Sequence, residues 1–83
     1  MTAEVVMPKL SKGMTEGTVA KWLKKEGEKV EKGEPLLEVM TEKAAYEVES
    51  PAKGVLSRIL VAEEEISPVG SVLGIIEESN SGL

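Results

Sequence analysis

Short apolar stretches alternate with polar residues along almost the whole chain. Valine, isoleucine and leucine recur at every second position, and glycine, proline, serine or Glu-Gly turns bound the stretches. This period of two is typical of β-strands that bury one face in a core. The pattern predicts strands over residues 3–7, 17–24, 36–41, 44–49, 54–61 and 72–77, with shorter pairings at 29–31 and 66–68.

The chain also repeats itself. Residues 17–23 align with residues 54–60, and several residues keep their type at the same offset: Glu26 and Glu63, Gly33 and Gly70, Leu36 and Leu73. The match is lost where Val30 faces Ser67, so we expect the second turn to be built differently. Two similar halves predict an all-β fold, a flattened β-barrel or sandwich of two four-stranded antiparallel sheets with quasi-twofold symmetry.

The inward positions of this barrel-sandwich hybrid follow from the alternation. The expected core consists of Val6, Val19, Trp22, Val30, Leu37, Val39, Val48, Leu56, Ile59, Ile66, Leu73 and Ile75. Residues 1–78 are expected to form the domain. Residues 79–83, Ser-Asn-Ser-Gly-Leu, have the composition of the start of a flexible linker.

Length and composition narrow the function. A chain of 83 residues with 41% hydrophobic and 30% charged residues fits one small globular domain. The net charge of −5 disfavours nucleic acid as a partner. No apolar run approaches the roughly 20 residues of a membrane helix, and the first residues do not read as a signal peptide. We therefore expect a cytoplasmic or matured organellar protein, with no membrane partner.

The missing residue types argue against catalysis by this domain. The chain has no histidine, no cysteine and no aspartate. The usual general base, the thiolate nucleophile and most metal ligands are therefore absent. A non-catalytic domain is expected, with no metal site.

One turn stands out as a place for chemistry. Residues 36–40 and 45–49 alternate on both sides of Thr41-Glu42-Lys43-Ala44, which predicts a β-hairpin with its tip at Glu42-Lys43. A lysine at a tight tip stands clear of the sheet, where an enzyme could acylate it. The same position also suits an ordinary solvated lysine.

Several motifs along the chain resemble a known family. They are Met7-Pro8-Lys9-Leu10, the segments 14–19, 22–27 and 30–36, and Glu49-Ser50-Pro51-Ala52-Lys53-Gly54-Val55-Leu56. In order and spacing they are similar to lipoyl domains of 2-oxo acid dehydrogenase acyltransferases, in the biotinyl/lipoyl attachment family. The likeness covers about residues 3–77. The family's Asp-Lys-Ala hairpin corresponds here to Glu42-Lys43-Ala44.

The resemblance implies lipoate as a covalent cofactor on Lys43, with Glu42 and Ala44 as its neighbours at the tip. The implied partners are a lipoate ligase or lipoyl-transfer enzyme, a thiamine-diphosphate-dependent dehydrogenase, an acyltransferase catalytic domain and dihydrolipoamide dehydrogenase. The lipoylated lysine would act as a swinging arm between their active sites. The resemblance further implies a monomeric domain within an acyltransferase chain, in the cytoplasm of a bacterium or archaeon or in the mitochondrial matrix of a eukaryote.

Three positions depart from the family pattern or have a second interpretation. Met40 replaces an acidic residue often found three positions before the lysine. Gly27 matches a turn glycine that the family uses in recognition, and it also suits any turn that needs a positive φ. The loop from Lys9 to Met14 matches the family's partner-recognition loop, but Ser11-Lys12-Gly13 replaces its usual Gly-Met-Thr.

The alternative function is a biotinyl carrier domain of a biotin-dependent carboxylase. Biotinyl domains have the same barrel and are also modified on a hairpin lysine. They resemble one another in a Met-Lys-Met sequence at the tip, whereas Lys43 lies between Glu42 and Ala44. A structural barrel without a modified lysine is a further alternative.

Overall fold

The structure is a computed structural model that describes residues 1–78, so the expected linker at 79–83 lies outside the described residues. Its strands are β1 (Thr2–Val6), β2 (Glu16–Trp22), β3 (Lys29–Val30), β4 (Pro35–Met40), β5 (Ala45–Glu49), β6 (Gly54–Ile59), β7 (Ile66–Pro68) and β8 (Val72–Glu78). All eight predicted strands are confirmed, and their ends move by at most two residues. Among the described residues, no helix is long and apolar enough to cross a membrane.

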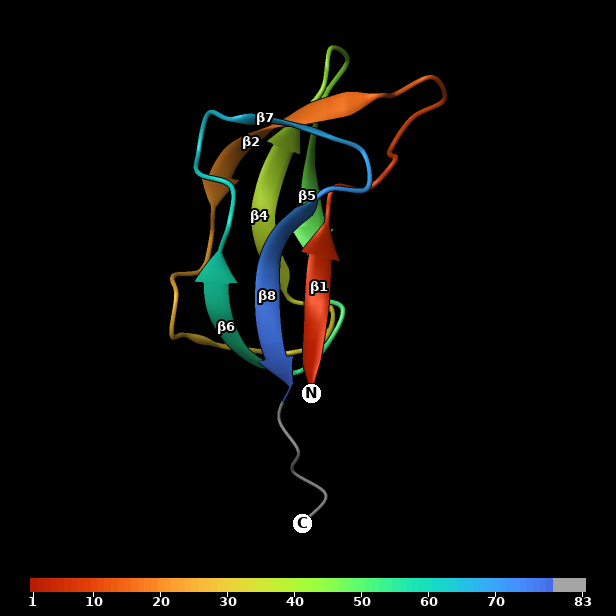
Figure 1. Ribbon diagram of the computed structural model, residues 1–83. Helices are drawn as coiled ribbons and strands as arrows, with labels where there is room; N and C mark the ends of the chain where they lie inside the picture. Colours follow the sequence, from red (N-terminus) through yellow and green to blue (C-terminus); the bar gives the residue numbers. More distant parts are fainter. Residues whose placement is uncertain (79–83) are drawn as a thin grey trace.

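The strands form two four-stranded antiparallel sheets, with orders β1-β8-β6-β3 and β5-β4-β2-β7. Figure 1 shows the two sheets facing each other around a narrow interior. Exchanging β1 to β4 for β5 to β8 converts one strand order into the other. The predicted all-β fold with quasi-twofold symmetry is therefore confirmed.

Backbone hydrogen bonds obey the same symmetry. The Val19 N–H donates to the Glu65 carbonyl at 2.9 Å, and the equivalent Leu56 N–H donates to the Glu28 carbonyl at 2.9 Å. Each bond joins a long strand of one half to the turn before the short strand of the other half. The two halves are thus interlocked, and neither could form its sheet alone.

The core lies between the sheets and consists of residues from both halves. The buried apolar side chains are Val5, Met7, Val19, Val30, Leu36, Leu37, Val39, Ala52, Leu56, Leu73 and Ile76. Three expected core residues, Trp22, Val48 and Ile59, are partly buried and pack against this cluster. Every buried polar side-chain atom in residues 1–78 has a hydrogen-bond partner.

The prediction of Val6 as a core residue is wrong. Val6 is 40% exposed, while Val5 and Met7 on either side are buried. Val6 lies on the same face of β1 as Glu4, which is exposed. Consecutive strand residues point to opposite faces, so residues two apart share a face. Val6 therefore lies on the solvent face with the Glu4 carboxylate, while Val5 points into the core.

Ile66 is also wrongly predicted as core, since it is 62% exposed and Ser67 is buried in its place. In the sheet, Ser67 lies opposite Gly17 and Ile66 lies opposite Thr18. The register of the repeat is kept even though the residue types change, with Ser67 in the position of buried Val30. The second turn is therefore not built differently, contrary to the expectation from the lost match.

Ile75 is the third misplaced core residue, because Ile76 is fully buried and Ile75 only partly. Ile76 lies opposite the buried Leu56 of β6. On its other side β8 has one extra residue against β1, since Val5 lies opposite Gly74 and Val6 opposite Val72, with Leu73 between them. This bulge interrupts the alternation within β8, so that Leu73 and Ile76 are both buried.

The start of β1 and the end of β8 lie at the opposite end of the molecule from the β4–β5 hairpin tip (Figure 1). At one end, the Glu78 N–H donates to the Met1 carbonyl at 2.8 Å, which joins β8 to the start of β1. At the other end, the connection between β4 and β5 projects beyond both sheets.

Candidate functional site

The β4–β5 hairpin closes with the tip Thr41-Glu42-Lys43-Ala44. Met40 and Ala45 form the last cross-strand pair. Beyond them, the Thr41 N–H donates to the Ala44 carbonyl at 2.9 Å. The strands therefore stay paired up to the two central residues, which gives the tip a firm base.

The Thr41 side chain stabilises the turn through hydrogen bonds to its backbone. Its Oγ1 accepts hydrogen bonds from the N–H groups of Lys43 and Ala44, each at 3.3 Å, and donates to the Ala44 carbonyl at 3.1 Å. Threonine hydroxyls commonly satisfy turn amides in this way. The backbone of Lys43 is thus held in place, while its side chain takes no part in holding the turn.

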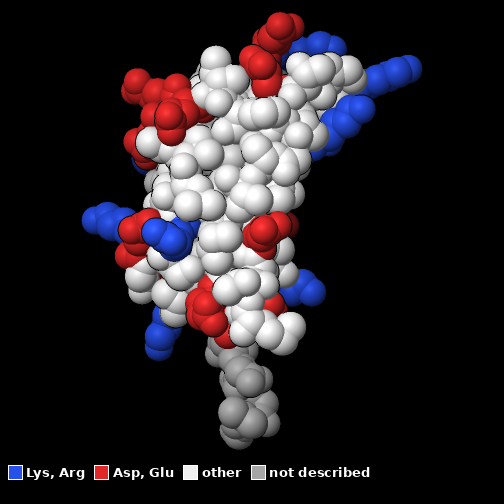
Figure 2. Space-filling model, viewed as in Figure 1, with Lys and Arg blue, Asp and Glu red and all other residues white. Residues whose placement is uncertain are grey.

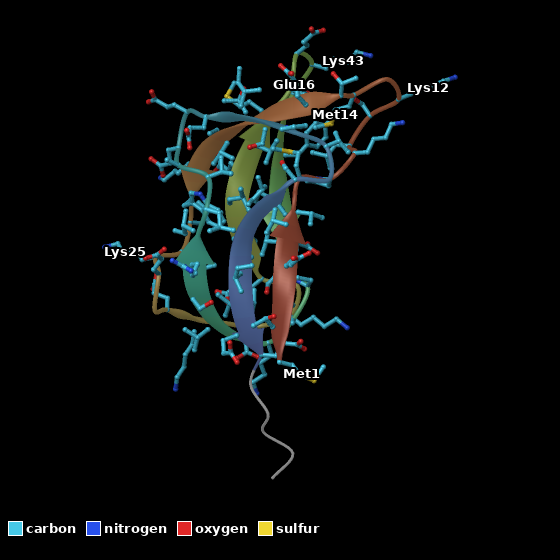
Figure 3. The ribbon with its side chains drawn as sticks, in the orientation of Figure 1. Met1, Lys12, Met14, Glu16, Lys25 and Lys43 are labelled. Atoms are coloured by element: carbon cyan, nitrogen blue, oxygen red, sulfur yellow. The ribbon has the colours of Figure 1, made fainter. Side chains whose placement is uncertain are left out.

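Lys43 is exposed at the tip, together with Glu42 and Ala44. Figure 3 shows its side chain extending away from the sheets at the end of the molecule. Within residues 1–78, the ion pairs join other groups: Lys24 with Glu34, and the N-terminal ammonium with Glu77. The Lys43 amine is therefore accessible to an enzyme from outside.

A groove of about 760 Å³ runs beside the tip. One wall is the β1–β2 loop with the start of β2, and the other wall is the hairpin tip. Its lining residues are Ser11, Lys12, Gly13, Met14, Thr15, Glu16, Gly17, Thr18, Met40, Thr41, Glu42 and Lys43. Lys43 thus stands at the rim of a groove of the size that holds small molecules, roughly 300 to 1,000 Å³.

The charges around the groove are mixed. Lys12 and Lys43 line it together with Glu16 and Glu42. Figure 2 shows basic side chains gathered at the loop side of this end and acidic side chains at the opposite side. The loop side is therefore the more positive part of a chain whose net charge is −5.

The structure brings together the three residues that the sequence predicted at the tip, Glu42, Lys43 and Ala44. It does not bring Gly27 to them. Gly27 lies in the β2–β3 connection with Lys25, which Figure 3 places far from Lys43. The φ of Gly27 is 92°, a conformation that favours glycine, so the geometry of the turn accounts for a glycine at this position.

Sequence reasoning missed the apolar part of the groove. Met14 lines one wall and packs against the core at the same time. In the sequence, Met40 was notable only because it replaces an acidic residue of the family pattern. In the structure it lines the other wall of the groove and is 51% exposed. A signal was available, because the loop before β2 is longer than its counterpart in the repeat.

Known proteins resemble this chain over nearly its whole length. Residues 3–76 match the model of the family described as biotin-requiring enzyme. The chain belongs to this biotin/lipoyl attachment family. Within the family it is a lipoyl domain, as the sequence motifs predicted. It is 32% identical to the lipoyl domain of the 2-oxoglutarate dehydrogenase complex from Azotobacter vinelandii, whose solution structure it matches with a TM-score of 0.76 over 93% of this chain and 98% of that one.

Curated relatives carry the same domain inside longer chains. The lipoyl domain is 48% identical over 95% of its length to the dihydrolipoyllysine-residue acetyltransferase component of the pyruvate dehydrogenase complex from Zymomonas mobilis. It is 43% identical over 94% of its length to the protein of the same description from Rickettsia conorii. The chain spans about a fifth of the length of these relatives, 18% and 19%.

Proposed function

We propose that this lipoyl domain is a carrier in which Lys43 bears a lipoyl group in amide linkage. The arm would move acyl groups and reducing equivalents between a thiamine-diphosphate-dependent dehydrogenase, an acyltransferase and dihydrolipoamide dehydrogenase. The observation that carries the proposal is the position of Lys43, exposed at a hairpin tip that lies at the opposite end of the molecule from the start of β1 and the end of β8. A lipoate ligase or lipoyl-transfer enzyme would load it.

The tip residues fit such a group. The Lys43 side chain is exposed, and the Thr41 hydroxyl holds the turn without using it. Amide formation at Nζ removes the lysine charge. Loss of this charge breaks no ion pair within residues 1–78, because the ion pairs there involve other groups.

The division of labour follows from the composition. When bound, the dithiolane supplies the sulfur atoms that take up acyl groups and electrons. The chain itself has no histidine, cysteine or aspartate to carry out acid–base or nucleophilic chemistry. Its residues display Lys43 and fix the backbone beneath it.

The parent chain is proposed to be a dihydrolipoamide acyltransferase. Support comes from the relatives from Rickettsia conorii and Zymomonas mobilis, which are acetyltransferase components of pyruvate dehydrogenase complexes. Tethering within such a chain would make each visit to an active site intramolecular, at an effective concentration of order mM for a short flexible linker. We propose that the domain works as a monomeric unit in the bacterial or archaeal cytoplasm, or in the mitochondrial matrix of a eukaryote.

The carrier function is tested by acyl acceptance. The lipoate-loaded domain is mixed with thiamine-dependent dehydrogenases specific for pyruvate, 2-oxoglutarate or branched-chain 2-oxo acids, each with its 2-oxo acid, and the intact mass is followed. At least one enzyme should open the S–S bond and add its acyl group to one sulfur and a single hydrogen to the other, with release of CO2 from the 2-oxo acid. A domain that carries lipoate on Lys43 but stays unacylated with all three enzymes would contradict the carrier function.

A further inference from the structure

The twofold symmetry of the domain is broken at one connection. Met7 and Ser50 are equivalent residues, because the Met7 N–H donates to the Ser71 carbonyl at 2.9 Å and the Ser50 N–H donates to the Glu34 carbonyl at 2.8 Å. A proline follows each of them. After this matched pair, the two halves take different routes to their next strand.

The connection between β1 and β2 spans nine residues, 7–15, whereas the equivalent connection between β5 and β6 spans four, 50–53. The short version closes the same strand geometry, so the barrel does not need the longer one. The additional residues lie beside the hairpin tip and form one wall of the groove. Their placement next to Lys43 therefore calls for a role other than closing the barrel.

The extra loop is ordered by its own contacts. The Met14 N–H donates to the Ser11 carbonyl at 3.1 Å, and the Thr15 carbonyl accepts from the Val69 N–H at 2.9 Å. Gly13 supplies a positive φ of 81° between them. The loop is thus a folded wall held against β7, which gives the groove a defined shape.

Two methionines give the groove apolar surface. Met14 lines the loop wall, where its Sδ accepts from the Leu10 N–H at 3.2 Å, and Met40 is 51% exposed on the hairpin wall. Figure 3 shows Met14 below the tip, with Lys43 extending toward the side of the loop that carries Lys12. Thioether side chains are flexible and polarisable, so they adapt to apolar groups of irregular shape.

We propose that this groove is a resting site for the arm on Lys43, an aliphatic chain that ends in a cyclic disulfide. The inference rests on the proposed function, since it needs a lipoyl group at Lys43. The aliphatic chain would lie against Met14 and Met40. Between visits to partner enzymes the arm would be held against its own domain, and the reactive ring would be shielded from solvent.

The chain contains four methionines, which allows a direct test by NMR of ¹³C-methyl-labelled methionine. Met14 and Met40 line the groove, Met7 is buried, and Met1 lies at the far end of the molecule. Spectra are recorded before and after loading with lipoate, and intact mass establishes that Lys43 is loaded. Lys43→Gln serves as a control that removes the charge without adding the chain.

Loading should shift the methyl signals of Met14 and Met40 and leave Met1 unchanged, and Lys43→Gln should not reproduce the shifts. Cross-relaxation between the methylene protons of the arm and both methyl groups is expected. In loaded Met40→Ser, cross-relaxation to Met14 should weaken. Loaded Leu60→Ser should retain it, because Leu60 is 50% exposed, like Met40, but lies outside the groove.

Two results are kept apart by this design. A loaded domain whose methionine signals match those of Lys43→Gln, without cross-relaxation to the arm, would overturn the resting site and leave the carrier function intact. A domain that gains no lipoyl mass would overturn the proposed function, and the resting site with it.

Discussion

The Glu26 carboxylate accepts a hydrogen bond from the backbone N–H of Ile59 at 2.7 Å. The equivalent bond in the other half joins the Glu63 carboxylate to the Trp22 N–H at 2.9 Å. In each case a turn residue of one half caps the last amide of the long strand in the other half. Side chains as well as backbone groups therefore hold the two halves together.

Replacing Glu26 by alanine should lower the free energy of unfolding by about 1 kcal/mol, because the Ile59 amide loses a charged acceptor. Glu26→Gln keeps a side-chain oxygen in reach and should cost less. Urea unfolding followed by circular dichroism measures both. Equal stability of the alanine variant and the parent would show that water replaces the bond without cost.

Glu64 has a φ of 74°, a left-handed conformation, where its twin Gly27 has a φ of 92°. We expect Glu64→Gly to raise the free energy of unfolding by about 0.5 kcal/mol, since relief of strain exceeds the added freedom of the unfolded chain. The reciprocal variant, Gly27→Glu, should cost about 1 to 2 kcal/mol although its side chain meets open space. Thermal unfolding of both variants tests the pairing of the two turns. A destabilised Glu64→Gly variant or a stabilised Gly27→Glu variant would contradict it.

Lys24 and Glu34 form an ion pair at 2.8 Å. The hydrogen bond to Glu34 raises the pKa of Lys24, and the hydrogen bond from Lys24 lowers the pKa of Glu34. The lowered pKa of Glu34 gives stability that is lost as pH falls through its folded value, and the raised pKa of Lys24 gives stability that is lost as pH rises through its folded value. The difference in unfolding free energy between the parent and Glu34→Gln should therefore be greatest near neutral pH. Even there the difference should be small, because the ion pair is at the surface. A pH series of urea titrations checks this; a difference that grows toward acid pH would contradict it.

The Trp22 indole is partly buried, and its Nε1–H donates to the Val61 carbonyl at 2.8 Å. Trp22→Ala should cost about 3 kcal/mol, at the lower end of the range for large aromatic truncations. Trp22→Phe should cost less, because it keeps a ring in contact with the core. Circular dichroism is the appropriate probe, since Trp22 is the single tryptophan of the chain. A near-neutral Trp22→Ala would place the indole outside the stabilising core.

Alternation of residue types was sufficient to predict the strands and the hairpin that displays Lys43. Period-two patterns depend on which face of a strand meets water, and most strands here have one polar face. The internal repeat added the pairing of the two halves. The role of Lys43 did not follow from these patterns, since an exposed turn lysine has the same local sequence whether or not it is modified. It depended on the resemblance to lipoyl domains.

The errors in the predicted core occur where hydrophobicity and register disagree. Ile66 is more apolar than Ser67, yet the register of β7 against β2 turns Ser67 inward. Ile75 and Ile76 are identical in type, so only the bulge at Leu73, where β8 pairs with β1, decides which is buried. Such choices depend on partners distant in sequence, which a single strand does not reveal.

The groove was beyond the sequence prediction for a related reason. Its two walls come from segments that are separated by more than twenty residues, and Met14 and Met40 line the same groove only after β2 and β4 have paired. The difference in length between the two equivalent connections is visible in the sequence. Its position beside Lys43 becomes visible only in the fold.

The most direct test of the central claim is the location of the lipoyl group. The domain is incubated with lipoate ligase, lipoate and ATP, digested, and mapped by mass spectrometry. Two variants are treated in parallel. Lys43→Arg keeps the charge but offers a guanidinium that stays protonated, and Lys25→Arg changes an exposed lysine in another turn. A separate reaction uses biotin ligase in place of lipoate ligase.

We predict a single lipoyl adduct on Lys43, its loss in Lys43→Arg, its retention in Lys25→Arg and no biotin adduct. A lipoyl group on another lysine, biotin on Lys43, or no adduct at all would contradict the assignment of Lys43 as the lipoyl attachment site.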